Sequence, residues 1–60
     1  MERYVFELSS NDKIFIDDQV VAIDGFVSID EELVYIQGYY VDTGDDFEQM
    51  YSLNDVVRIS

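Results

Sequence analysis

Four carboxylates crowd into one short stretch of the chain, and they are the side chains best suited to chemistry. They are Asp42, Asp45, Asp46 and Glu48. Carboxylate oxygens are the hard ligands that Ca²⁺ and Mg²⁺ prefer, but this spacing lacks the alternating ligands and the distant bidentate glutamate of an EF-hand. Adjacent acids also seldom aim at one ion. We therefore expect no metal site and no cofactor, and a divalent-cation loop over residues 42–48 stands only as an alternative hypothesis.

These acids belong to a strong excess of negative charge. The chain has 3 Lys and Arg residues against 14 Asp and Glu residues, which gives a net charge of −11. Direct binding to nucleic acid is not expected, because phosphate binding needs Lys and Arg to displace counterions. Anionic membrane surfaces should repel the chain for the same reason. The expected partner is a protein with a basic surface, since complementary potentials steer association.

The leading hypothesis is that the carboxylates imitate the phosphates of a nucleic acid on a partner protein. Acids fall at most of the expected turns, so the fold could present them along one rim that also includes Asp17, Asp18 and Asp30. Two adjacent tyrosines would anchor the contact, because tyrosine is enriched at protein interfaces. The candidate partner-binding residues are Glu31, Glu32, Tyr39, Tyr40, Asp42, Asp45, Asp46 and Glu48. The competing explanation is that the acidity only keeps a small domain soluble.

Catalysis is not expected. The chain has no His and no Cys, and Lys13 is its single lysine. There is thus no disulfide framework and no thiolate zinc site. Paired carboxylates need a cleft that separates their pKa values, and a chain this short has little room for one. A non-catalytic rival hypothesis is a small structural subunit that forms a homo-oligomer through strand edges and an apolar face.

Length and hydropathy point to a single small domain spanning residues 1–60. A chain of 60 residues buries only about 60% of the surface that its unfolded form exposes, so we expect marginal stability. No apolar run approaches the ~20 residues of a membrane span. The N-terminal residues lack the apolar and basic segments of a signal peptide, so the cytoplasm is the expected compartment.

Periodicity predicts strands throughout. Apolar residues alternate, β-branched and aromatic residues are frequent, and no segment keeps a helical period. The expected strands are residues 3–8, 13–16, 19–23, 26–29, 33–41, 47–53 and 56–59.

The dipeptide Asp24-Gly25 lies between two apolar runs and predicts a two-residue type I′ hairpin with Ile23 opposite Phe26. Such a hairpin has two apolar faces. The face expected to meet the core is Val20, Ala22, Val27 and Ile29. The other face, which needs cover from another strand or a partner, is Val21, Ile23 and Phe26.

Two glycines and one polar cluster predict local irregularities. Gly38 inside a strand indicates a bulge or a sharp bend. Gly44 is available for a positive φ in the loop after that strand. Residues 52–56 resemble one turn of 3₁₀ helix, with Ser52 or Asn54 as a local cap.

From Asp18 to Ile59 the layout resembles the small SH3-like barrels of KOW-type and related domains. The features are "IDGFV", "YIQGYYV", a loop, "EQMYSL", "NDV" and a final "VVRI". The resemblance implies an all-β fold, a small five- to six-stranded SH3-like barrel with one 3₁₀ turn near the C-terminus. Many KOW-type domains carry basic residues for RNA or ribosome contact. This chain lacks them, so the resemblance implies the fold and argues against that activity.

The small size, the acidity and the absence of Cys also resemble small early proteins of bacteriophages, many of which bind and redirect a host protein. The sequence therefore predicts a phage-type accessory or inhibitor protein that engages a basic surface of a host protein handling nucleic acid.

Overall fold

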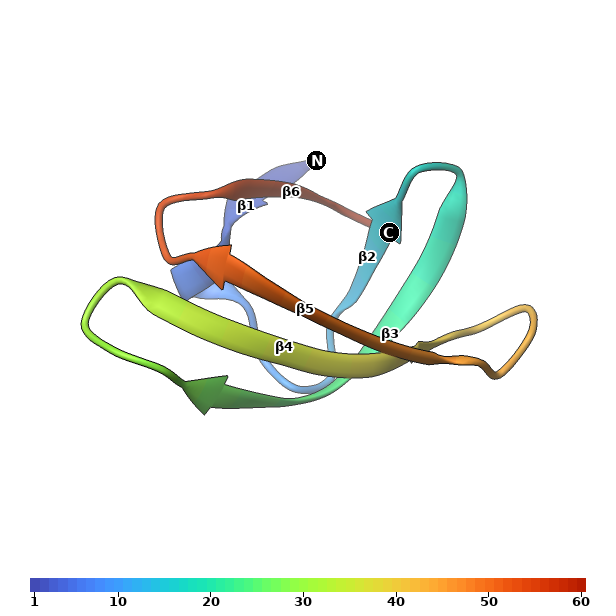
Figure 1. Ribbon diagram of the computed structural model, residues 1–60. Helices are drawn as coiled ribbons and strands as arrows, with labels where there is room; N and C mark the ends of the chain where they lie inside the picture. The colour runs from blue at the N-terminus through green and yellow to red at the C-terminus, as the bar shows by residue number, and fades with distance from the viewer.

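The computed structural model describes residues 1–60 and folds them into one antiparallel sheet of six strands with one short 3₁₀ helix (Figure 1). The elements are β1 (Glu2–Tyr4), η1 (Val5–Glu7), β2 (Lys13–Ile16), β3 (Gln19–Ser28), β4 (Leu33–Tyr40), β5 (Asp46–Ser52) and β6 (Val56–Ile59). The prediction of an all-β chain is confirmed. The strands expected at 13–16, 33–41, 47–53 and 56–59 have their predicted bounds to within one residue.

The strand order across the sheet is β1-β6-β2-β3-β4-β5. Strands β2 to β5 follow one another as neighbours, β6 returns to pair with β2, and β1 lies outside β6. The sheet curls, as Figure 1 shows. Its edge strands β1 and β5 therefore come near each other, although they lie at opposite ends of the strand order. No ladder joins β1 to β5. Instead, two backbone hydrogen bonds join η1, which follows β1, to the segment that follows β5. Val5 N–H donates to the Asp55 carbonyl (2.8 Å), and Phe6 N–H donates to the Leu53 carbonyl (3.3 Å).

One cluster of apolar side chains fills the inside of the curl. Its buried members are Val5, Ile14, Val21, Ile23, Val34, Ile36, Phe47 and Val57. In β3 and β4 they occupy alternate positions, Val21 with Ile23 and Val34 with Ile36, as a strand with one buried face requires. No polar or charged side chain is buried. Burial of each Val, Ile or Phe stabilises the fold by about 1.5–3 kcal/mol, so this cluster is the main source of stability.

The prediction of a hairpin at Asp24-Gly25 is wrong. Residues 19–28 form one continuous strand, β3, and Asp24 is an extra residue in a β-bulge. Ile23 pairs with Gly38 and Gly25 with Gln37, so nothing on β4 lies opposite Asp24. Pairing on both sides of the bulge holds β3 against β4 along almost its whole length, and a turn at this point would break that pairing.

The hairpin turn lies earlier, at Asp17-Asp18. Ile16 pairs with Gln19, which leaves only the two aspartates to connect β2 with β3. Asp17 has a φ of 55°, the only non-glycine residue with a positive φ. Aspartate tolerates this left-handed region better than most side chains.

The prediction of which β3 residues face the core is therefore also wrong in part. Ala22 is buried as expected, but the side chains of Val27 and Ile29 are 46% and 51% exposed. Val21 and Ile23, assigned to the second face, are buried in the core. The self-association face made of Val21, Ile23 and Phe26 thus does not exist as a free surface.

The 3₁₀ helix lies at the opposite end of the chain from its predicted place. The segment expected as a strand at 3–8 divides into β1 and η1, and residues 53–54 form a simple turn between β5 and β6. Ser52 still supports that turn, because its hydroxyl accepts a hydrogen bond from Asn54 N–H (3.2 Å). The strand at 3–8 is interrupted because the N–H groups of η1 bond to the residue 53–55 segment instead of to a strand partner.

At Gly38 the backbone of β3 leaves no room for a side chain on β4. A Cβ at position 38 would overlap the carbonyl oxygen of Ala22 and lie 3.2 Å from Cα of Ile23. The bulge expected near Gly38 is present, but it is in the partner strand β3. Gly44 has the positive φ expected of it, at 76°.

Replacing Gly38 by alanine should destabilise the protein by about 2–3 kcal/mol, because backbone atoms have no room to move away from the added methyl group. The matched control is Gly25→Ala in the same bulge, where an added Cβ meets nothing within 4 Å. The control should stay within about 0.5 kcal/mol of the parent. Urea unfolding followed by circular dichroism measures both changes, and equal stabilities of the two variants would contradict this account of the close approach.

Candidate functional site

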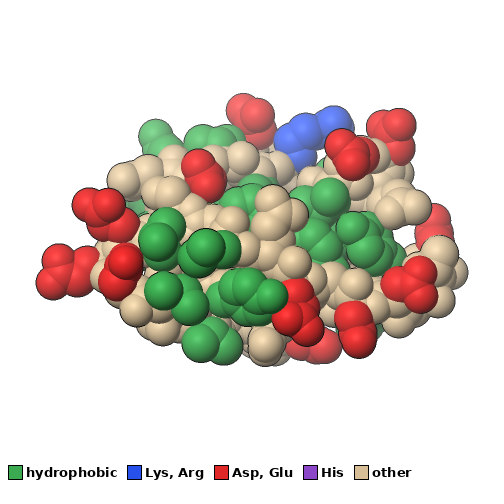
Figure 2. Space-filling view, viewed as in Figure 1, with side chains coloured by type: hydrophobic (Ala, Val, Ile, Leu, Met, Phe, Trp, Pro, Cys, Tyr) green, Lys and Arg blue, Asp and Glu red, His purple; other side chains and the backbone are tan.

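Nine of the 14 acids lie at the two ends of the molecule. The first acidic end combines the β2–β3 turn with the β4–β5 loop and comprises Asp17, Asp18, Asp42, Asp45 and Asp46. The second acidic end combines the β3–β4 and β5–β6 connections and comprises Asp30, Glu31, Glu32 and Asp55. Figure 1 places these pairs of connections at opposite ends, and Figure 2 shows acidic side chains at both. The single acidic rim expected from the sequence is therefore divided in two.

Backbone hydrogen bonds hold each end together. At the first acidic end, Val41 N–H donates to the Val20 carbonyl (2.9 Å), which ties the start of the β4–β5 loop to β3. At the second, Leu53 N–H donates to the Glu32 carbonyl (2.8 Å). The longest dimension of the molecule is 32 Å.

The β4–β5 loop has a defined backbone and free carboxylates. Tyr40 N–H donates to the Asp45 carbonyl (2.9 Å), and Gly44 N–H donates to the Tyr40 carbonyl (2.7 Å). Asp45 N–H donates to the Thr43 hydroxyl (3.2 Å). The side chains of Asp42, Asp45 and Asp46 accept no hydrogen bond and are exposed. Their charges are thus fully available to a partner.

The second acidic end contains two carboxylates that shape the backbone, those of Asp30 and Asp55, and Asp55 Oδ2 accepts a hydrogen bond from Ser52 N–H (2.9 Å). Asp30 Oδ1 accepts hydrogen bonds from the N–H groups of Glu32 (2.8 Å) and Leu33 (2.9 Å), which shapes the turn into β4. The side chains of Glu31 and Glu32 make no such bond. Together Asp30, Glu31 and Glu32 line a shallow, open hollow.

Neither end brings carboxylates together as metal ligands. Nowhere in the structure do three Asp or Glu side chains lie close enough to hold a metal ion. The loop at 42–48 therefore presents separate charges.

The two candidate tyrosines have different surroundings. Tyr39 is 40% exposed, pairs across the ladder with Asp46, and lines a shallow hollow with Lys13 and Asp24. Tyr40 faces inward and packs edge-on against Phe47, with 5.7 Å between ring centroids. Tyr39 is thus the tyrosine that a partner can reach.

Glu48 lies on the outer face of β5 and bonds to a tyrosine of β4. The Tyr35 hydroxyl donates to Glu48 Oε2 (2.9 Å). This hydrogen bond, with some burial and the negative charge of Glu48, raises the pKa of Tyr35. The pKa of Tyr51 is also raised, first by burial and then by the charge of Asp55.

A row of apolar side chains on the outer face was not predicted as a surface feature. Val27, Tyr35 and Met50 stand opposite one another on β3, β4 and β5. Met50 is 51% exposed. Figure 2 shows hydrophobic side chains gathered over this part of the sheet, with acids around them. The alternation of "FEQMYS" could have revealed the position of Met50, but Val27 could be placed only after the bulge was known.

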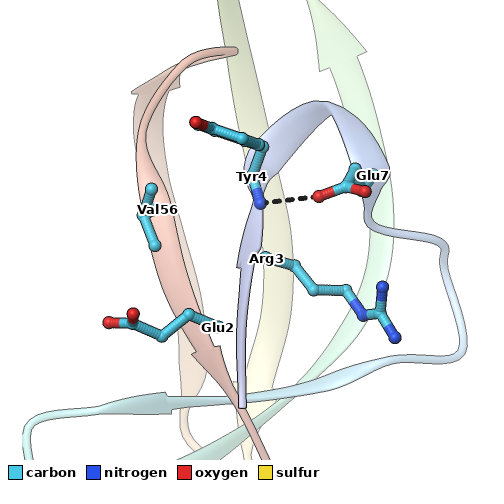
Figure 3. A pocket seen from close by; sticks show the side chains of 5 residues that line it. All are labelled: Glu2, Arg3, Tyr4, Glu7 and Val56. Atoms are coloured by element: carbon cyan, nitrogen blue, oxygen red, sulfur yellow. Dashed lines mark hydrogen bonds between the residues drawn. The ribbon is translucent and has the colours of Figure 1, made fainter.

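An exposed aromatic pair lies where β1 continues into η1. The rings of Tyr4 and Phe6 stack with centroids 5.3 Å apart and planes inclined by 12°. The hollow next to them is lined by Glu2, Arg3, Tyr4, Glu7 and Val56. In Figure 3 the Glu2 and Tyr4 side chains point to one side of β1 and those of Arg3 and Glu7 to the other. Because its polar groups diverge, this hollow lacks the convergent set that a catalytic or small-molecule site needs.

The few cations do not neutralise the acids by hydrogen bonding. Carboxylates accept hydrogen bonds only from backbone N–H groups and from the Tyr35 hydroxyl. Arg58 instead stacks over the Phe15 ring, with its Cζ 5.0 Å from the ring centroid. The negative potential therefore extends outward from the surface.

Comparisons with known proteins leave the chain without an assigned family. No protein-family model matches it, and a search of curated proteins finds no significant match. No helix in the structure has the length and apolar character needed to cross a membrane.

The Tyr35–Glu48 bond predicts a specific change on alkaline titration. Glu48→Gln should lower the pKa of Tyr35 toward the usual value of about 10, because the carboxylate that favours the protonated hydroxyl is removed. Since the folded-state pKa is raised, the stabilisation that this bond contributes is complete below the unfolded pKa and disappears as the pH rises through the folded pKa. Tyrosinate absorbance, compared with and without Tyr35→Phe, measures the shift.

The control for this titration is Glu31→Gln, which removes the same charge from the second acidic end and should leave the pKa of Tyr35 unchanged. A Glu48→Gln protein whose Tyr35 titrates like that of the parent would show that the bond does not form in solution.

Proposed function

We propose that this chain is a non-catalytic protein-binding module, an acidic phage-type accessory or inhibitor protein that acts in the cytoplasm on a basic surface of a host protein handling nucleic acid. The observation that carries this proposal is the net charge of −11, unneutralised within the fold and presented on exposed carboxylates. Such a potential speeds encounter with basic clefts and suppresses encounter with anionic ones.

An SH3-like barrel is the architecture that we propose for this module. Its support is the strand order, in which β2 to β5 form a meander and β6 returns to β2. The bonds from η1 to residues 53–55 bring the two edges of the curled sheet near each other, as in a partly open barrel. A small rigid barrel holds its loops at fixed positions, which suits a binding role.

The first acidic end is the proposed centre of the contact. There Asp42, Asp45 and Asp46 have free carboxylates, and the exposed Tyr39 lies beside Asp46. Tyr40 acts by positioning the loop, because its N–H and carbonyl bond to Asp45 and Gly44. The charges of Glu31 and Glu32 add to the long-range field from the opposite end of the molecule.

A self-associating structural subunit is the second candidate, and one observation favours it. Strand β5 has a free edge, which invites pairing with another chain. The burial of Val21 and Ile23 removes the apolar face on which this hypothesis relied. Each added copy also brings a further net charge of −11. We therefore rank it below binding to a basic partner.

The proposal predicts salt-sensitive capture of a basic protein. A tagged pull-down from bacterial lysate at about 0.05 M and about 0.5 M salt should recover one dominant nucleic-acid-handling protein only at low salt, because exposed charges are screened at high salt. Mass spectrometry identifies the captured protein. Competition between the purified partner's nucleic acid and this chain then tests whether the two share a surface.

Two double variants separate the proposed contact from general charge. Asp45→Asn with Asp46→Asn and Glu31→Gln with Glu32→Gln each remove two charges, in both cases from side chains that make no hydrogen bond. The first should weaken binding to the captured partner roughly tenfold more than the second, as expected for local rather than distant charges. Recovery of the bait alone at both salt concentrations would refute the proposal for that host.

A further inference from the structure

Strand β5 is an uncovered edge of the sheet. It pairs with β4 along one side, from Tyr39↔Asp46 to Leu33↔Ser52, and no strand pairs with its other side. At seven residues it is longer than the opposite edge strand β1, which has three. An edge of this length is a ready template for another extended chain.

The hydrogen-bond phase shows which backbone groups of β5 are free. Tyr40 N–H donates to the Asp45 carbonyl, so residue 45 directs its backbone toward β4. The direction alternates along an antiparallel strand. The N–H and carbonyl groups of Asp46, Glu48 and Met50 therefore point away from β4, into the open edge. Val41 N–H donates to the Val20 carbonyl, so residue 41 directs its backbone toward β3, whereas residue 40 directs its backbone toward β5. This alternation agrees with the assignment.

The same three residues project their side chains onto the outer face of the sheet. Asp46 and Glu48 are exposed carboxylates, and Met50 is 51% exposed at the end of the row formed with Tyr35 and Val27. The edge thus presents two negative side chains and one apolar side chain on one face, each on a residue whose backbone is free to pair.

We propose that β5 binds a basic, extended segment of the partner protein as a seventh, antiparallel strand. This inference rests on the proposed function and names the part of the partner that is recognised. An antiparallel strand reads from Met50 toward Asp46, so the segment has an apolar residue followed at alternate positions by two Lys or Arg residues. Its apolar side chain packs on Met50, and its two cations face Glu48 and Asp46.

Charge is the reason to assign this edge to a basic strand and not to a second copy of the chain. Two copies paired through β5 about Gln49 would set Glu48 opposite Met50 and Asp46 opposite Ser52, and would bring the four carboxylates of both strands onto the same outer face without an opposite charge. They would also double a net charge of −11. Opposite charges across a ladder stabilise pairing, and a basic strand supplies them.

A synthetic peptide tests this directly. The peptide Thr-Leu-Thr-Lys-Thr-Lys-Thr, capped at both ends, places Leu opposite Met50 and the lysines opposite Glu48 and Asp46. Isothermal titration and amide shifts of ¹⁵N-labelled protein should show binding centred on β5. A composition-matched peptide with adjacent lysines, Leu-Thr-Thr-Lys-Lys-Thr-Thr, should bind at least roughly tenfold more weakly, because one lysine then points to the wrong face.

Backbone N-methylation separates strand pairing from charge attraction. Methyl groups on the N atoms of Leu and both lysines block the N–H groups that face β5, whereas methyl groups on the intervening threonines point to solvent. The first peptide should lose at least roughly tenfold in affinity relative to the second. Equal affinities would overturn the proposal while leaving a charge-driven protein contact standing.

Two variants of the protein make the reciprocal test. Met50→Pro removes the free edge N–H without touching the bonds to β4, and proline is tolerated at such an edge position. Met50→Ala keeps the N–H and removes the side chain. Peptide affinity should fall further in the proline variant than in the alanine variant. The peptide-methylation series holds even if the proline variant fails to fold.

Sedimentation of the unliganded protein completes the test. A monomer is expected. A dimer that persists in high salt and loses its association on Met50→Pro would assign the edge to a second copy and overturn the basic-strand proposal. Failure of the designed peptide to bind at low salt would overturn it as well. Salt-sensitive capture of a basic host protein would still decide the proposed function separately.

Discussion

The close approach of β4 to the Ala22 carbonyl, at Gly38, is the constraint on which the rest of the fold depends. Strand β3 is the bridge between the two parts of the sheet, since it pairs with β2 through residues 19–22 and with β4 through residues 21–28. Its bulge at Asp24 lies beside the one position of β4 where a side chain does not fit. A bulge bends a strand and increases its twist. That bend lets one sheet of six strands enclose its own core, with Ile14 and Ile36 completely buried inside it.

Local patterns predicted most of the strands and the break at Asp17-Asp18, but they also predicted a hairpin at Asp24-Gly25, where β3 continues. Asp24-Gly25 satisfies the usual preference for a hairpin, whereas Asp17-Asp18 requires a residue with a Cβ in the left-handed region. The second turn forms because an uninterrupted β3 gains pairing with β4 on both sides of the bulge. Those pairings join residues that are between 6 (Ser28 and Val34) and 19 (Val21 and Tyr40) positions apart, so the few residues around either dipeptide do not contain the information.

The candidate site was predictable in its chemistry and less so in its geometry. Composition gives the excess of acids, and the polar loop gives the exposed carboxylates at 42–46. Strand alternation places the neighbouring residues Tyr39 and Tyr40 on opposite faces of the sheet. The separation of Glu31 and Glu32 from the β4–β5 loop depends on which connections meet at each end of the sheet. The free edge of β5 depends on strand order, and the aromatic pair at Tyr4 and Phe6 on a 3₁₀ helix in place of a strand.

The pairing of β1 with β6 has a consequence for how the chain is made. Glu2 lies opposite Arg58, and Ile59 N–H donates to the Met1 carbonyl (2.7 Å), so the first strand has no neighbour until the sixth has been synthesised. Ribosomes add roughly 5–20 residues per second, so β1 waits for several seconds as an unpaired nascent segment. During that interval Tyr4 and Val5 are open to chaperones and to other chains. Residues 1–13 carry three acids and two bases, so little net charge protects this segment from association during that interval.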